Sequence, residues 1–237
     1  RCPLSEHSGF AFPEADALKD ALEPADALWM GRPNNPTGNL ISKQLILDLV
    51  GRFPDKWFIV DEAFIQFRED WHTESLLTES PRPNLLVLHS LTKFFAIAGL
   101  RLGGVVGDDA VVARLRKAKE PWSVNGIADR VGILLADCAH YEEKSRAMVR
   151  QEAARVYGRI QAMKGIIPHP SSVNYLLCQW TRTGNLDDLL RHLLSHHLYI
   201  RDCRNFPGLE QNYFRIGLKT GPDNDRLLSL LGSYPSF

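Results

Sequence analysis

Short apolar runs that end in polar residues recur along the first half of the chain and restrict its fold most. They are "DALWMGRP", "KWFIVDEAF" and "NLLVLHS". Between the first two, residues Ser42 to Phe53 have the spacing of an amphipathic helix. Buried runs that alternate with helices are typical of the α/β class, with a mainly parallel sheet and flanking helices. The run "LRLGGVVG" predicts a fourth strand of this sheet.

The pattern of predicted helices and strands changes after about residue 123, and the whole chain is predicted to divide into three segments. Residues 1–123 would form part of a large α/β domain that ends in a helix and a break at Pro121. Residues 124–163 predict a long helical tract between the domains. Residues 164–237 predict a small C-terminal α+β domain, with strands at "VNYLLCQW", "YIRDC" and "YFRIGLKT". The chain starts at Arg1 rather than Met, which suggests a truncated protein.

Composition narrows the class of protein. Among 237 residues, 44% are hydrophobic, enough for a sizeable core, and 28 Lys+Arg balance 28 Asp+Glu. A net charge of +0 gives no global field for nucleic acid or an anionic membrane, and no apolar run reaches the ~20 residues of a membrane span. The four cysteines lie far apart without a C-x-x-C motif, which argues against a zinc knuckle and favours a reducing cytoplasm.

Polar segments follow three successive predicted strands and carry the candidate chemistry. They are "NNPTG" (Asn34 to Gly38), "DEAF" (Asp61 to Phe64) and "SLTK" (Ser90 to Lys93). Ligands of α/β sheets collect where the carboxyl ends of strands converge, so these segments predict one site. Asp61 follows a buried strand, so its carboxylate needs a charged or hydrogen-bonding partner, and we expect a cation near it.

Two kinds of site could use these residues. A metal site would take Asp61, Glu62 and His89, but no second histidine has useful spacing, and Glu62 should face away from Asp61 along a strand. The alternative is pyridoxal 5′-phosphate. Its ring nitrogen would be held protonated by Asp61, its aldehyde bound by Lys93 as an imine, and its phosphate bound by Ser90 and Arg101. This cofactor matches each part of the pattern.

Four motifs, in this order, resemble the signature of the fold-type I pyridoxal-phosphate enzymes, the aspartate-aminotransferase superfamily. They are "NNPTG", "VDEAF", "SLTKFFAIAGLRLG" and "FRIG". The resemblance implies that Lys93 is the Schiff-base lysine and Asp61 the partner of the pyridine nitrogen. It also implies that Asn35 donates a hydrogen bond to the phenolic oxygen of the ring, and that Ser90 and Arg101 bind its phosphate.

Further motifs resemble one branch of that superfamily, which holds histidinol-phosphate aminotransferase and threonine-phosphate decarboxylase. They are "PWSVN", "VNYLL", "YIRDCRNFPGL" and "YFRIGLKT". Phe64 departs from the tyrosine common in aminotransferases at this place. The resemblance therefore leans towards decarboxylation of L-threonine O-3-phosphate in cobalamin biosynthesis, by a cytoplasmic homodimer. Transamination of a histidinol-phosphate type stays open as the alternative.

The substrate end of the site has its own candidates. Arg215 on "YFRIG" offers a planar fork for a carboxylate, and Arg201 on "YIRDC" adds a second cation if the two strands pair. Two arginines suit a small molecule with two anionic groups. The resemblance assigns Arg215 to the amino-acid carboxylate, Arg201 to the substrate phosphate, and Asn174 to a hydrogen bond with the bound substrate.

Part of the family's site is not recognisable in the sequence. No glycine-rich phosphate-binding segment, stacking aromatic residue or tyrosine lent across a dimer can be identified. The chain is thus expected to hold the lysine half of the site. A hypothesis of another class follows: a cofactor-free fragment or association module, which would expose a sheet edge and apolar surface.

Overall fold

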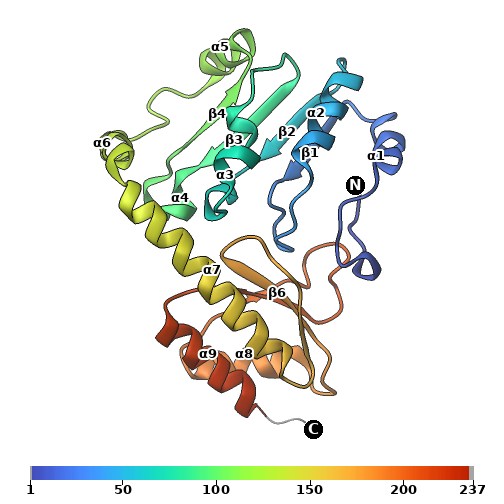
Figure 1. Cartoon of the computed structure of the whole chain (residues 1–237), viewed down its shortest axis with the longest axis vertical. Coiled ribbons are helices and arrows are strands. Elements are labelled where there is room, and N and C mark those ends of the chain that lie inside the picture. The colour runs from blue at the N-terminus through green and yellow to red at the C-terminus, as the bar shows by residue number, and fades with distance from the viewer. Residues whose placement is uncertain (1, 235–237) are drawn as a thin grey trace.

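The computed structural model describes residues 2–234 in two lobes (Figure 1). Arg1 and residues 235–237, at the outer ends of the predicted segments, lie outside the described residues. The upper lobe contains a four-stranded sheet in the order β1-β2-β3-β4. Its strands are β1 (Ala27–Gly31), β2 (Trp57–Asp61), β3 (Leu85–Ser90) and β4 (Gly103–Gly107).

The last strand, β4, does not continue the parallel arrangement of the sheet. The pairs β1–β2 and β2–β3 are parallel, but β4 runs antiparallel to β3, with Ser90 opposite Gly103. The connection folds locally as α4 (Leu91–Phe94) and η4 (Ala98–Leu100). A parallel return would need a crossover that runs back along the whole sheet. The sheet is therefore mixed, though mainly parallel as the sequence predicts.

Only one face of the sheet is densely covered. Alternate residues such as Met30, Val60 and Val87 point to a core formed with α1 (Ala15–Leu22) and α2 (Lys43–Arg52). On the other face Trp29 is 66% exposed and Trp57 is 38% exposed. Parallel strands are normally buried on both faces. The second face is thus an apolar surface of the kind that another segment or protein can cover.

A set of helices connects the two lobes. They are α5 (Asp109–Ala118), α6 (Gly126–Leu134), η5 (Leu135–Asp137) and α7 (Ala139–Gln161). The range 124–163, which the sequence predicts as a helical tract, is helical over most of its length, with η5 and Cys138 between α6 and α7. From this break, α7 runs from the upper lobe down along the lower one (Figure 1). The described residues contain no helix that combines the length and apolar character of a membrane span.

The lower lobe is an antiparallel sheet in the order β5-β6-β8-β7, packed against helices. Its strands are β5 (Ile166–Pro168), β6 (Tyr175–Trp180), β7 (Arg201–Asp202) and β8 (Tyr213–Gly217). The helices α8 (Leu186–Ser195) and α9 (Gly221–Ser233) share its core with α7. In α8 the buried residues Leu186, Leu189 and Leu193 recur at helical spacing, and Asn185 caps the first turn.

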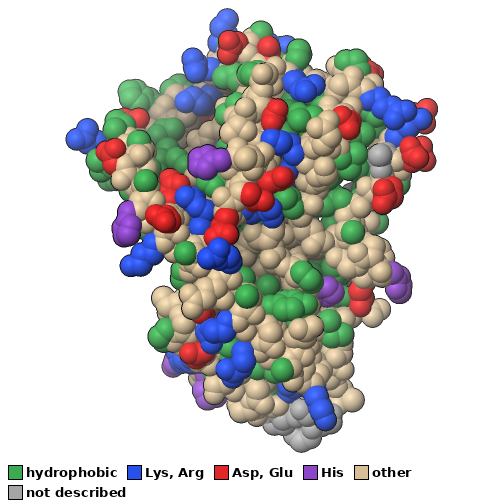
Figure 2. Space-filling model, in the orientation of Figure 1, with side chains coloured by type: hydrophobic (Ala, Val, Ile, Leu, Met, Phe, Trp, Pro, Cys, Tyr) green, Lys and Arg blue, Asp and Glu red, His purple; other side chains and the backbone are tan. Residues whose placement is uncertain are grey.

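The remaining helices are short. They are η1 (Glu6–Ser8), η2 (Ile65–Phe67), α3 (Trp71–Glu74) and η3 (Leu76–Thr78). Of these, η1 lies against the lower lobe, where Gln179 of β6 donates to Glu6 at 2.9 Å. Acidic and basic side chains are interspersed over the face of the molecule in Figure 2.

Hydrogen bonds tie the lobes together at the loop after β1. The hydroxyl of Tyr175 donates to the carbonyl oxygen of Asn34 at 2.7 Å. Ser172 donates to the carbonyl oxygen of Gly38 through both its hydroxyl, at 2.8 Å, and its backbone amide, at 3.1 Å. The "NNPTG" loop of the upper lobe is therefore fixed by the lower lobe.

Candidate active site

The polar segments after β1, β2 and β3 meet at one edge of the upper sheet. Gly31 pairs with Asp61, and Asp61 pairs with Leu88, so the three strands end side by side, about 4.8 Å apart. Paired residues share a face, and Ser90 lies two residues beyond Leu88 on the same face. Asp61 and the start of the Lys93 turn are therefore on the same side of the sheet.

Lys93 lies in α4, directly after the end of β3. The hydroxyl of Ser90 begins this turn by accepting a hydrogen bond from the amide of Thr92 at 3.4 Å, and it lies 2.7 Å from the Thr92 hydroxyl. The Lys93 side chain is exposed and forms no hydrogen bond or ion pair within residues 2–234. Its amine is free to react with a carbonyl compound.

Asp61 has a hydrogen-bonding partner but no cationic one in the described part of the chain. Its Oδ1 accepts from the amide of Ala63 at 3.0 Å. The buried guanidinium of Arg32, which lies after the neighbouring strand, pairs instead with the next residue, Glu62, at 3.0 Å. Asp61 is left able to face a cation that is not part of the chain.

The pair of Arg32 and Glu62 belongs to the covered face of the sheet. Both side chains are fully buried, and Glu62 also accepts from Ser75 and from the amide of Leu76. Burial raises the pKa of Glu62, while these hydrogen bonds and the charge of Arg32 act in the opposite direction. Arg32 also donates to the carbonyl oxygen of Ile41 at 2.9 Å, so it closes the base of the "NNPTG" loop.

The geometry does not favour a metal site at these strand ends. Glu62 faces away from Asp61, as strand alternation predicts. Burial lowers the pKa of His89, and the charge of Asp61 raises it in part. No group of three or more His, Cys, Asp or Glu residues among those described could hold a metal ion.

Asn35 and Arg215 come together from the two lobes. An Nη1 hydrogen of Arg215 is donated to Oδ1 of Asn35. The amide nitrogen of Asn35 remains as a donor, which is what a contact with a phenolic oxygen requires. The Arg215 guanidinium also lies over the ring of Tyr175, at 4.8 Å from its centroid.

Arg201 and Arg215 are direct neighbours across β7 and β8. They are partners in the antiparallel register, so their side chains share a face. Arg201 donates to Asn205 at 3.1 Å and lies over the ring of Phe206. Neither arginine pairs with a carboxylate within residues 2–234. Two unneutralised arginines in register are suited to bind an anion.

Asn174 and Arg101 complete the predicted residues. Oδ1 of Asn174 is buried without a hydrogen-bond partner among the described residues, while its backbone carbonyl accepts from Leu218 at 2.8 Å. Arg101 is exposed, has a φ of 55°, and donates to the carbonyl oxygen of Ala98 at 3.0 Å. It lies two residues before Gly103, which pairs with Ser90. Arg101 thus starts close to the Ser90 turn.

Tyr175 belongs to this site but was not predicted from the sequence. It lies in the apolar run "VNYLLCQW", where a tyrosine reads as a core residue. Its ring packs edge to face against Phe64, with centroids 5.0 Å apart. Burial raises the pKa of its phenol, as does the charge of Asp61, while the charge of Arg215 lowers it.

These residues fit the predicted cofactor. Within residues 2–234, Lys93 provides an amine without a partner, and Asp61 a carboxylate without a cation. The side-chain oxygen of Asn35 accepts from Arg215, and its nitrogen has no partner among the described residues. An amine for the aldehyde, a carboxylate for the ring nitrogen and an amide donor for the phenolic oxygen are the groups that this cofactor requires.

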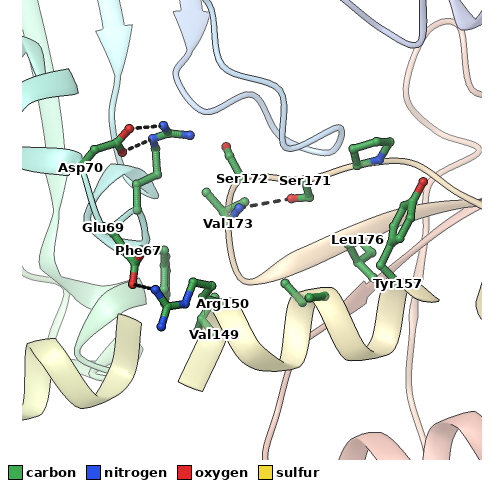
Figure 3. A pocket seen from close by; sticks show the side chains of 14 residues that line it. Phe67, Glu69, Asp70, Val149, Arg150, Tyr157, Ser171, Ser172, Val173 and Leu176 are labelled. Atoms are coloured by element: carbon green, nitrogen blue, oxygen red, sulfur yellow. Dashed lines mark hydrogen bonds and ion pairs between the residues drawn. The ribbon is translucent and has the colours of Figure 1, made fainter. Parts of the chain in front are cut away.

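A cavity of about 610 Å³ lies beside the site rather than in it (Figure 3). It is lined by α7, by the segment after η2, and by Ser171 to Val173, and none of the predicted site residues lines it. Ion pairs of Arg150 with Glu69 and of Arg68 with Asp70 lie at its wall. The predicted cofactor-binding residues instead lie at or after the strand ends of the upper sheet, with Asp61 ending β2 and Ser90 ending β3.

The fold defines the class of protein. The structure matches a decarboxylase from Sulfurospirillum multivorans with a TM-score of 0.87 and 26% identity, covering 98% of this chain and 68% of the other. It matches the histidinol-phosphate aminotransferase from Clostridium acetobutylicum with a TM-score of 0.88 and 26% identity, covering 96% and 68%. A mixed sheet with flanking helices and a small antiparallel sheet is the fold of pyridoxal-phosphate-dependent aminotransferases.

The sequence comparison gives the family. The model of aminotransferase class I and II matches residues 4–231, and the chain belongs to this family, whose members depend on pyridoxal 5′-phosphate.

Relatives fall into two groups. The chain is 37% identical over 235 residues to the threonine-phosphate decarboxylase of Salmonella typhimurium, covering 98% of this chain and 63% of that protein. It is 26% identical over 229 residues to a histidinol-phosphate aminotransferase of Methanococcus maripaludis, covering 96% and 61%. The chain thus spans less than two thirds of the length of these relatives.

Proposed function

We propose that the whole protein decarboxylates L-threonine O-3-phosphate with pyridoxal 5′-phosphate, as a step of cobalamin biosynthesis. The similarity to threonine-phosphate decarboxylase supports this, as does 28% identity over 214 residues to a bifunctional adenosylcobalamin biosynthesis protein of Leptospira interrogans. The observation that carries the proposal is the pairing of Arg201 with Arg215 without carboxylate partners in the described residues. The substrate has the two anionic groups that such a pair can bind.

Each predicted site residue would contact a different part of the cofactor. Lys93 would hold the aldehyde carbon through Nζ, and Asp61 would keep a proton on the ring nitrogen. Asn35 would donate through Nδ2 to the phenolic oxygen, and Ser90 and Arg101 would bind the phosphate. When bound, pyridoxal 5′-phosphate supplies an electron sink for the pair left behind when a bond to the substrate Cα breaks.

Substrate orientation would then decide which bond breaks. Arg215 would bind the carboxylate and Arg201 the phosphate, while Asn174 offers a hydrogen bond close by. These two contacts would fix the orientation of the substrate in the site, and with it which bond at Cα is broken. Nζ of Lys93 would hold the proton that replaces the carboxylate on Cα when CO₂ leaves, and the product would be aminopropanol phosphate.

A transamination of the histidinol-phosphate type is the second candidate function. It uses the same residues, and relatives with that name reach 31% identity, as in the protein from Desulfitobacterium hafniense. Phe64 favours the decarboxylase, because the tyrosine hydroxyl common in aminotransferases is absent there.

Product analysis separates the two functions. The whole protein with pyridoxal 5′-phosphate should release CO₂ from L-threonine O-3-phosphate without consuming a keto acid. Conversion of histidinol phosphate that depends on a keto acid would support the aminotransferase instead. Absence of both reactions, together with absence of cofactor binding, would favour an association module.

The organisation of the whole protein is part of the proposal. We place it in the cytoplasm as a homodimer, with the domain division at 1–123, 124–163 and 164–237. The exposed apolar face of the upper sheet is compatible with an association surface. Sedimentation of the whole protein tests the dimer, and a single monomeric species would contradict it.

A further inference from the structure

Tyr175 contacts both the loop after β1 and Arg215 on β8, although the sequence motifs assign it no role. Its hydroxyl donates to the carbonyl oxygen of Asn34 at 2.7 Å, and Asn34 directly precedes Asn35. The face of its ring carries the guanidinium of Arg215 at 4.8 Å. One side chain therefore contacts both the loop that offers an amide to the cofactor and the arginine that faces the substrate.

Tyr175 is buried and packed against another aromatic ring. Its side chain is 3% exposed, and its ring is packed edge to face against Phe64 at an interplanar angle of 87°. Burial raises the pKa of the phenol, so the hydroxyl stays a donor at neutral pH. Phe64 has no hydroxyl, so the phenol that lies between the Asn34 carbonyl and Arg215 is that of Tyr175.

We propose that Tyr175 is the positioning residue that fixes Asn35 and Arg215 relative to each other. Its hydroxyl holds the backbone of the Asn35 loop, and its ring holds Arg215 in the orientation that presents a flat fork to a carboxylate. This inference rests on the proposed function for the identity of the ligands. It goes beyond that function by assigning the hydroxyl of Tyr175 to the cofactor-facing loop and its ring to the orientation of Arg215.

Two substitutions separate the hydroxyl from the ring. Tyr175→Phe removes the bond to Asn34 and keeps the ring, so the dissociation constant of pyridoxal 5′-phosphate should rise about 2- to 12-fold, with KM for the substrate within about 2-fold. Tyr175→Leu also removes the ring beneath Arg215. KM should then rise a further 2- to 30-fold, roughly, while kcat changes less.

The assays are chosen to exclude a merely structural role. Absorbance titration of the whole protein gives the cofactor dissociation constant, steady-state kinetics give KM and kcat, and thermal melting reports stability. Tyr157→Phe is the matched control, because this phenol lines the neighbouring cavity and has no hydrogen bond among the described residues. It should leave the dissociation constant and KM unchanged.

The outcomes distinguish this proposal from the proposed function. A raised dissociation constant in Tyr175→Phe supports the positioning role even if threonine phosphate is not a substrate, because the titration uses the cofactor alone. A dissociation constant equal to that of the unsubstituted protein overturns it, even if decarboxylation is found. Should Tyr175→Leu fail to fold, Tyr175→Phe alone decides. Equal KM values for both folded variants would overturn the role of the ring.

Discussion

Replacement of Arg201 by Ala should weaken substrate binding strongly and change the stability of the fold only slightly. Arg201 lies opposite Arg215, and like charges in direct register destabilise a sheet by roughly 0.2–1 kcal/mol, which the substitution relieves. It also removes the exposed contact with the ring of Phe206, worth about 0.5–1 kcal/mol. The two effects oppose each other, so the free energy of unfolding should change by less than about 1 kcal/mol.

Substrate binding should respond far more strongly. Hydrogen bonds between a charged donor and a phosphate are worth about 1.5–3 kcal/mol, so losing one such contact should raise KM for L-threonine O-3-phosphate about 10- to 150-fold. Phosphate added to the assay should inhibit the unsubstituted protein and have less effect on the variant. Arg191→Ala is the control, because Arg191 is an exposed arginine that pairs with Asp188 on α8.

The assay combines thermal melting with steady-state kinetics on the same preparations. For a chain of this size, 1 kcal/mol corresponds to roughly 2–4 °C in the midpoint. A variant that melts more than about 5 °C lower with KM unchanged would refute the reasoning, since Arg201 would then be a structural residue.

The remaining predictions concern buried groups. Arg32→Met should cost about 3–5 kcal/mol of unfolding free energy at pH 7, because it leaves Glu62 buried without its cation. Burial raises the pKa of Glu62 in the folded state, so this carboxyl becomes protonated while the pH is still above its ordinary value of 4.5. The loss of unfolding free energy caused by Arg32→Met should therefore shrink as pH falls towards 4.5 and grow as pH rises. Equal losses at pH 5 and pH 8 in urea melts would contradict this. Burial raises the pKa of Cys203 to about 11 and also raises that of Cys178. Maleimide at pH 8 should therefore label exposed Cys2 before either thiol, as read by peptide mass spectrometry, and rapid labelling of Cys178 would show that this core opens.

The positions of the strands and of their polar ends could be predicted from sequence. Apolar runs specify buried strands, and strand alternation places Asp61 and Ser90 on one face once the register is known. The pairing of β7 with β8, on which the two-arginine hypothesis depended, is present in the structure. Local pattern was sufficient for β1, β2 and β3, because each is an apolar run that ends in or just before polar residues.

Features that depend on distant contacts could not be predicted in this way. The antiparallel direction of β4 follows from the local fold of residues 91–102, and the break between α6 and α7 has no proline to mark it. Arg32 reads as a turn residue, yet it is buried with Glu62 from another strand. Tyr175 reads as a core aromatic, because its partners Asn34 and Arg215 are remote in sequence.

The central claim is that the amine of Lys93 binds the aldehyde of pyridoxal 5′-phosphate opposite Asp61. The most direct test is to load the whole protein with the cofactor, reduce it with borohydride, and locate the modified residue by peptide mass spectrometry. We expect the modification on Lys93, and Lys93→Ala should lose both the modification and the visible absorbance of the bound cofactor. Modification of a different lysine, or an unchanged spectrum in Lys93→Ala, would contradict the account.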